Sequence, residues 1–112
     1  MEDMRMKLVK EIKKSEFLIS SWGIYELSDE QVKKYGKRYA LSQGVFSDYA
    51  LENMGEDVLL AGLREHMYEG FFDAENEAYL TVKTVELQNK LDRLEYAIRD
   101  LVKLSGKGTS LE

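Results

Sequence analysis

The only histidine of the chain, His66, stands three residues before Glu69. In a helix this spacing places the imidazole and the carboxylate on one face, where both can ligate a metal ion. The pair supplies only two ligands, so a complete site would have to borrow Asp73, Glu75 or groups of a second copy. We therefore interpret the pair as polar residues of a helix surface, and we predict neither a metal nor another cofactor.

Nucleophilic chemistry has equally little support in the sequence. The chain contains no cysteine, and no serine stands in a Gly-x-Ser-x-Gly elbow. A single histidine would have to serve any catalytic triad. The pair Gly106-Lys-Gly108 lies in the tail, without the strand and helix that a phosphate-binding loop requires. The sequence thus predicts a protein that is not an enzyme.

A segment that interleaves basic and aromatic residues could contact nucleic acid. Its cations, which could hold phosphates, are Lys33, Lys34, Lys37 and Arg38. Just beyond them, Ala40–Val45 resembles the turn of helix-turn-helix units, and residues 24–54 are loosely similar to a ribbon-helix-helix module. These resemblances imply an alternative function, a dimeric DNA-binding accessory protein of a phage or plasmid. The would-be recognition helix, residues 47–54, has two acids and no Lys or Arg to read bases, which makes DNA the less favoured partner.

Negative charge is concentrated in the middle of the chain. The net charge is −5, and residues 46–79 hold nine Asp and Glu but one Arg. Such a block repels phosphate and attracts a basic surface. We therefore expect a basic protein to contact this part of the chain. The acidic residues assigned to that surface are Asp48, Glu52, Glu56, Asp57, Glu65 and Glu69.

Near the carboxyl end, four leucines recur every seventh residue, with other residues at the alternate heptad position. Such a seam is typical of a coiled coil, in which a second copy covers it. The residues predicted to form this dimer interface are Leu80, Thr84, Leu87, Leu91, Leu94, Ile98 and Leu101. The alternative is that the helix packs on its own domain, because Ala97, Val102 and Leu104 widen the apolar stripe. A helical bundle shared by two protomers would satisfy both interpretations.

The elements that carry these residues are expected to be mostly helical. Periodicity and capping residues predict helices over residues 3–15, 28–42, 47–54 and 56–68. Residues 17–27 are rich in aromatic and β-branched side chains and predict the one short strand. We therefore expect a mainly α fold of four to five helices.

Two larger units follow from this pattern. A small helical domain is expected over residues 1–72, followed by a long amphipathic helix over residues 73–104. A second strand over residues 78–85 is the alternative for the start of that helix, since this stretch has strong β character. Residues 105–112 have the composition of a flexible tail, and Leu111-Glu112 is typical of residues added by cloning.

Composition limits the function classes further. No stretch approaches the roughly 18 apolar residues of a transmembrane span, and the amino terminus lacks an apolar signal-peptide core. We therefore expect a cytoplasmic protein that contacts no membrane. The predicted function is that of a non-enzymatic, homodimeric interaction or regulatory protein, assembled through its C-terminal helix.

Overall fold

The computed structural model describes residues 5–63 and 70–105 of the chain. Within these residues four strands form one antiparallel sheet, in which neighbours in sequence are neighbours in space. The strands are β1 (Lys7–Ile12), β2 (Trp22–Glu26), β3 (Tyr39–Gln43) and β4 (Gly70–Phe72). The helices of the described chain are α1 (Asp29–Tyr35), α2 (Asp48–Asn53), α3 (Glu56–Leu60) and α4 (Glu75–Ser105). The expected mainly α fold with one short strand is therefore wrong, because the sheet is the centre of the structure.

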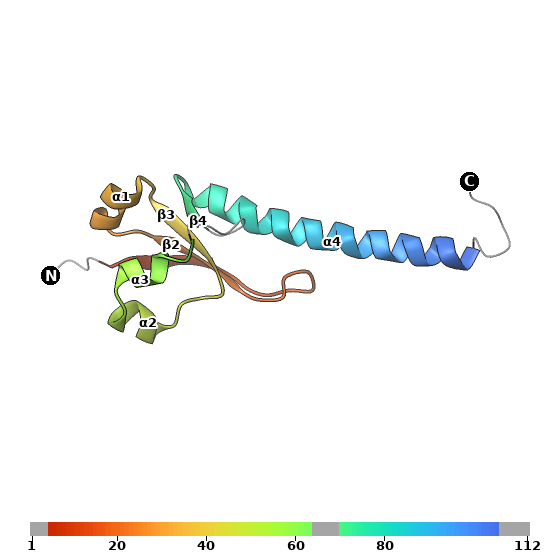
Figure 1. Cartoon of the computed structure of the whole chain (residues 1–112), viewed down its shortest axis with the longest axis horizontal. Coiled ribbons are helices and arrows are strands. Elements are labelled where there is room, and N and C mark those ends of the chain that lie inside the picture. Colours follow the sequence, from red (N-terminus) through yellow and green to blue (C-terminus); the bar gives the residue numbers. More distant parts are fainter. Residues whose placement is uncertain (1–4, 64–69, 106–112) are drawn as a thin grey trace.

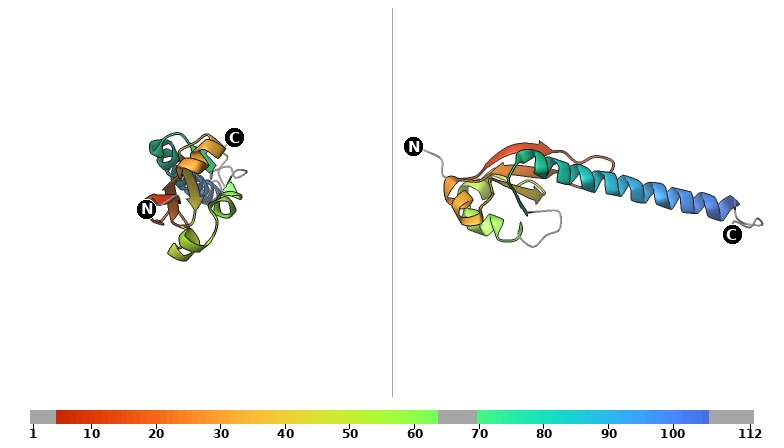
Figure 2. Two further views of the ribbon diagram at one scale, coloured as in Figure 1. Left: turned by 90° about the vertical axis from the view of Figure 1, so that its left-hand side faces the viewer. Right: turned by 90° about the horizontal axis from the view of Figure 1, so that it is seen from above.

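Helices lie on both faces of this sheet (Figure 1). On one face, Tyr25, Leu27 and Ala40 form a buried cluster with Leu60 and Leu63, against which residues of α1 and α2 also pack. Figure 2 shows α4 leaving the sheet as a long arm that extends well beyond it. At about 1.5 Å per residue the 31 residues of α4 span roughly 46 Å, which accounts for most of the 73 Å length of the molecule.

The opposite face of the sheet is covered by the first turns of α4. Here Trp22, Ile24 and Leu41 are buried together with Ala78 and Val82 of the helix. Alternate residues of β2 and β3 thus point into two different apolar layers. Because apolar layers cover both faces of the sheet, four successive residues of β2 and three of β3 are buried, and neither strand alternates between apolar and polar residues.

The first predicted helix, over residues 3–15, is wrong. Residues 7–12 form the edge strand β1, which pairs antiparallel with β2 and has a register shift between Leu8 and Lys10. The irregularity of this strand hides its period of two, and its lysines are typical of an edge strand that must not pair with another molecule. Helical spacing of a few apolar residues was therefore a misleading signal here.

The predicted helix over residues 28–42 begins as expected but ends early. Ser28 caps α1 by accepting a hydrogen bond from the backbone N–H of Gln31. Gly36 then adopts a left-handed conformation with φ of 75° and ends the helix. The residues that follow form β3, so neither the helix-turn-helix nor the ribbon-helix-helix resemblance corresponds to the folded chain.

The remaining elements agree with the predictions to different extents. Ser47 caps α2 as expected, whereas α3 is shorter than the predicted helix over residues 56–68, of which residues 64–68 lie outside the described part. The hydrophobic pair Phe71-Phe72 belongs to β4, a strand the sequence did not predict. The alternative of a strand over residues 78–85 is wrong, because these residues lie inside α4. The long C-terminal helix is confirmed.

Candidate self-association surface on the C-terminal helix

The helix α4 is anchored to the sheet by small and β-branched residues of its first turns. Ala78 and Val82 are 0% exposed and contact the layer that contains Trp22, Ile24 and Leu41. Glu77 caps the start of the helix, because its side chain accepts a hydrogen bond from the backbone N–H of Ala74 at 3.0 Å. These contacts fix which face of α4 is turned toward the domain.

The predicted interface residues lie on the other side of this helix. At 3.6 residues per turn, the heptad positions are rotated by roughly 160° from Ala78 and Val82. The leucines and isoleucine among them are 51–64% exposed. We refer to these positions as the apolar seam: Leu80, Thr84, Leu87, Leu91, Leu94, Ile98 and Leu101.

Thr84 is the one polar member of the apolar seam. Its hydroxyl group donates a hydrogen bond to the carbonyl oxygen of Leu80 at 2.8 Å. The polar group is therefore satisfied within the helix, and the methyl group can take part in apolar contacts. A threonine at this position is compatible with a buried interface.

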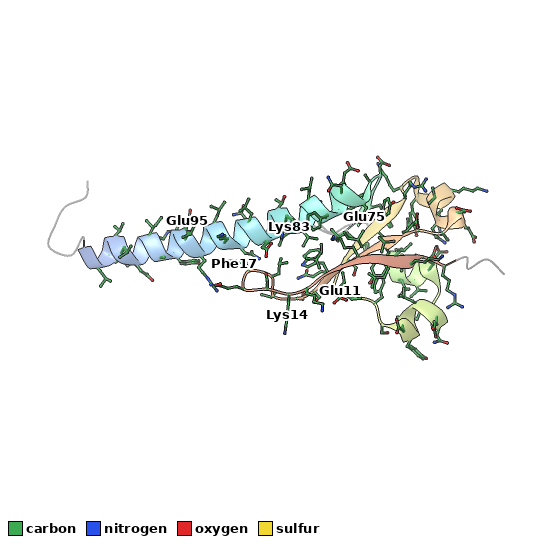
Figure 3. The ribbon with its side chains drawn as sticks, turned by 180° about the vertical axis from the view of Figure 1, so that it is seen from behind. Glu11, Lys14, Phe17, Glu75, Lys83 and Glu95 are labelled. Atoms are coloured by element: carbon green, nitrogen blue, oxygen red, sulfur yellow. The ribbon has the colours of Figure 1, made fainter. Side chains whose placement is uncertain are left out.

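The tip of the β1–β2 hairpin, residues 15–18, extends beyond the sheet and contacts α4 (Figure 3). Asn89 Nδ2 donates a hydrogen bond to the carbonyl oxygen of Phe17 at 2.7 Å. The guanidinium group of Arg93 lies 4.9 Å from the centroid of the Phe17 ring and pairs with Glu16 at 3.0 Å. The hairpin tip thus contacts α4 as far as Arg93 on the side away from the apolar seam. Nothing in the local sequence pattern predicted these contacts, which join residues more than 70 positions apart.

One carboxylate links the hairpin tip to a lysine of α4. Glu86 accepts a hydrogen bond from Ser15 Oγ at 2.8 Å and from Lys83 Nζ at 2.8 Å. The hydrogen bonds from Lys83 and Ser15 lower the pKa of Glu86 below its ordinary value. The same carboxylate raises the pKa of Lys83. Both shifts favour the charged forms, so this contact is electrostatically stable near neutral pH.

The four basic residues predicted for nucleic-acid contact gather around the end of α1. Lys34 Nζ lies 3.1 Å from a carboxylate oxygen of Asp57, and Lys37 Nζ lies 3.1 Å from that of Asp73. Arg38 is 4.0 Å from Glu26, and Lys33 is exposed. Three of the four cations therefore have a carboxylate beside them, which reduces the positive potential that a phosphate would meet.

The acidic residues predicted to meet a basic partner do not share one environment. The carboxylate of Glu56 accepts hydrogen bonds from the backbone N–H of Met6 and from Ser28 Oγ, so it connects the start of α3 to the residues just before β1 and α1. Asp57 pairs with Lys34, as described above. Glu65 and Glu69 lie outside the described residues, as does His66.

The other two acidic candidates, Asp48 and Glu52, belong to α2. They line a surface pocket of about 300 Å³ whose wall also contains Arg5 and Lys7. The charges of this pocket are mixed. It therefore offers a basic partner less attraction than the sequence count of acidic residues indicated.

The side chains and helices of residues 5–63 and 70–105 also bear on metal binding and on membrane insertion. No cluster of three His, Cys, Asp or Glu side chains in this part of the chain has the arrangement to hold a metal ion. None of the helices in the same ranges combines the length and the apolarity needed to span a bilayer.

With the geometry of α4 known, the chain was compared with models of protein families, with curated proteins and with solved structures. None of the three comparisons found a match.

Proposed function

We propose that this chain is a non-enzymatic, homodimeric interaction or regulatory protein that assembles through the apolar seam of α4. The observation that carries the proposal is the exposure of the seam. Its leucines and isoleucine remain more than half exposed while a different face of the same helix is buried on the sheet. Packing on its own domain thus accounts for Ala78 and Val82 but leaves the heptad uncovered.

A second copy of the same helix is the occupant that this surface fits best. Heptad spacing brings the seam of one helix into continuous contact with the seam of an identical helix, each side chain packing between four of the partner. Contiguous exposed apolar surfaces of this kind mark sites of association in proteins. The hairpin tip supports the same arrangement, because it holds α4 from the opposite side and leaves the seam accessible.

The alternative of DNA binding has less support. It requires Lys33, Lys34, Lys37 and Arg38 to present positive charge to phosphates, and three of these residues lie beside carboxylates. It also requires a helix or ribbon that reads bases. The helix at the expected recognition position, α2, carries Asp48 and Glu52 but no Lys or Arg, and β3 lies where the turn before it was expected. A basic partner protein remains compatible with the proposal, with Asp48 and Glu52 as the acidic side chains of the predicted set on α2.

The experiment that tests the proposal is a measurement of mass by light scattering over a range of protein concentrations. We expect the mass to rise from 13.0 kDa for the monomer to twice that value as the concentration increases. The double variant Leu87→Glu/Leu94→Glu places charges in the seam and should stay monomeric over the same range. Circular dichroism checks that the variant keeps its helix. A wild-type chain that remains at 13.0 kDa at the highest concentration would refute the proposal.

A further inference from the structure

Resting on the proposed self-association, we infer that the two copies of α4 pair in parallel and in register, with both sheet domains at the same end of the coil. The inference comes from the residues that flank the apolar seam. These flanking residues stand just before or just after the seam positions in each heptad. Their charges influence whether two helices pair in parallel or antiparallel orientation. One flank carries Lys83, Lys90 and Ala97, and the other carries Gln88, Glu95 and Val102.

Parallel pairing brings each residue of the first flank next to the residue five positions later in the other copy. Lys90 then meets Glu95 of the other copy, a favourable pair of opposite charges. Ala97 meets Val102, so two apolar residues that lie beside the seam are buried together. Lys83 meets Gln88, which is neutral. Each of these contacts occurs twice in a symmetric dimer, and none of them opposes like charges.

Antiparallel pairing in the register that places Thr84 opposite Leu101 gives a poorer match. The first flank of one helix then lies against the first flank of the other helix. This places Lys90 next to Ala97 of the other copy, and Lys83 next to Leu104. Both contacts put an ammonium group against an apolar side chain of the other copy, which removes water from the charge without providing a counterion across the interface. Glu95 meets Gln88 instead of a lysine. Charge complementarity thus favours the parallel arrangement.

The position of each domain is compatible with this arrangement. The sheet and the hairpin tip contact α4 through Ala78, Val82 and Asn89, which lie on the far side from the seam. Two domains at one end of a parallel coil therefore face outward. Figure 3 shows Lys83 and Phe17 where the hairpin tip lies beside α4, and Glu95 on the part of the helix that extends past it. The Lys90 ammonium lies 5.8 Å from the Phe17 ring, between the hairpin tip and the seam.

Disulfide cross-linking tests the orientation directly, because the chain has no cysteine of its own. In a parallel dimer every residue lies opposite its own copy, so Leu87→Cys and Ile98→Cys should each give a covalent dimer under mild oxidation. In an antiparallel dimer a residue meets its own copy only at the centre of the pair. Two positions 11 residues apart, about 16 Å along the helix, cannot both lie there. Tyr96→Cys, on the opposite side of α4 from the seam, is the matched control and should stay monomeric on a denaturing gel.

An exchange of charges provides a second readout that does not depend on cysteine. Lys90→Glu and Glu95→Lys should each weaken the homodimer, since each places like charges next to each other. An equimolar mixture of the two variants restores both ion pairs in a parallel heterodimer. The heterodimer, measured by native mass spectrometry, should therefore exceed the share expected from random pairing.

The outcomes separate this inference from the proposed function. If Leu87→Cys cross-links with Ile98→Cys in a mixture while neither cross-links with itself, the copies pair in the antiparallel direction and the parallel inference fails. Self-association would still stand in that case. If the chain stays monomeric in light scattering, both proposals fail. Random pairing of the charge variants would contradict the contact between Lys90 and Glu95.

Discussion

Truncation of one leucine of the apolar seam should weaken assembly by an amount that the structure allows to be calculated. Full burial of a leucine side chain is worth about 1.5–3 kcal/mol relative to full exposure. Leu94 is 51% exposed in the single chain, so roughly half of this value, about 1 kcal/mol, is still to be gained when a second copy covers it. A symmetric dimer contains two such side chains. The change Leu94→Ala should therefore cost about 2 kcal/mol of association free energy, or roughly a 30-fold increase in the dissociation constant.

Alanine is the best helix former, so this substitution does not disturb α4 itself. The matched control is Tyr96→Ala, which removes a larger side chain that is 66% exposed but lies on the opposite side of the helix. Sedimentation equilibrium over a wide concentration range gives the dissociation constants of both variants and of the wild type. The control should leave the constant unchanged within about threefold, which corresponds to less than 1 kcal/mol.

Two results would refute the reasoning. If Leu94→Ala leaves the dissociation constant unchanged, the seam is not the contact surface. If Tyr96→Ala weakens assembly as strongly as Leu94→Ala, the whole surface of the projecting helix contributes and the heptad has no special role. Circular dichroism at the concentrations used shows whether both variants keep the helix content of the wild type.

Further predictions concern the fold that presents the seam. Val82→Ala removes two methyl groups from the layer between α4 and the sheet and should lower the free energy of unfolding by about 2 kcal/mol in urea titrations. Gly23→Ala would place a Cβ atom 2.6 Å from the hydroxyl oxygen of Tyr25, which is buried, and should destabilise the protein by about 1–3 kcal/mol in thermal unfolding. The lowered pKa of Glu86 means that its ionised form stabilises the hairpin contact above the ordinary carboxylate pKa. This stabilisation should be lost as the pH falls through the lowered value. In an NMR titration, Ser15→Ala should move the pKa of Glu86 back toward its ordinary value, and an unchanged pKa would contradict the hydrogen bond.

The long helix could be predicted from the sequence because all its evidence is local. Heptad spacing from Leu80 to Leu101, and the absence of Gly and Pro between them, are visible within one segment. The same holds for the caps at Ser28 and Ser47, whose side chains bond to backbone groups three residues later. Hydrogen bonds within a single helical turn depend only on neighbouring residues, so they can be predicted from the sequence.

The sheet could not be predicted in this way, because its strands are stabilised by partners far along the chain. Residues 7–12 have apolar side chains at helical spacing, yet pairing with β2 and the register shift after Leu8 decide their conformation. The buried strands β2 and β3 carry no alternation, since helices cover both faces. For β4, three residues are too few to give any periodic signal. Tertiary pairing overrides local propensity in each case.

The sequence of α4 allows two interpretations, self-association through the heptad and packing of the helix on its own domain, and the structure of the helix is compatible with both. Self-association and packing on the domain each need an apolar stripe on the helix. The helix has two stripes: a short one with Ala78 and Val82, which is buried on the sheet, and the longer heptad on the other side. The small side chains of Ala78 and Val82 let the helix approach the sheet closely, and the leucines of the heptad lie on the outward side of the helix. Since burial of the first stripe fixes the rotation of the helix, the domain itself determines that the heptad residues face outward, where the proposed second copy would meet them.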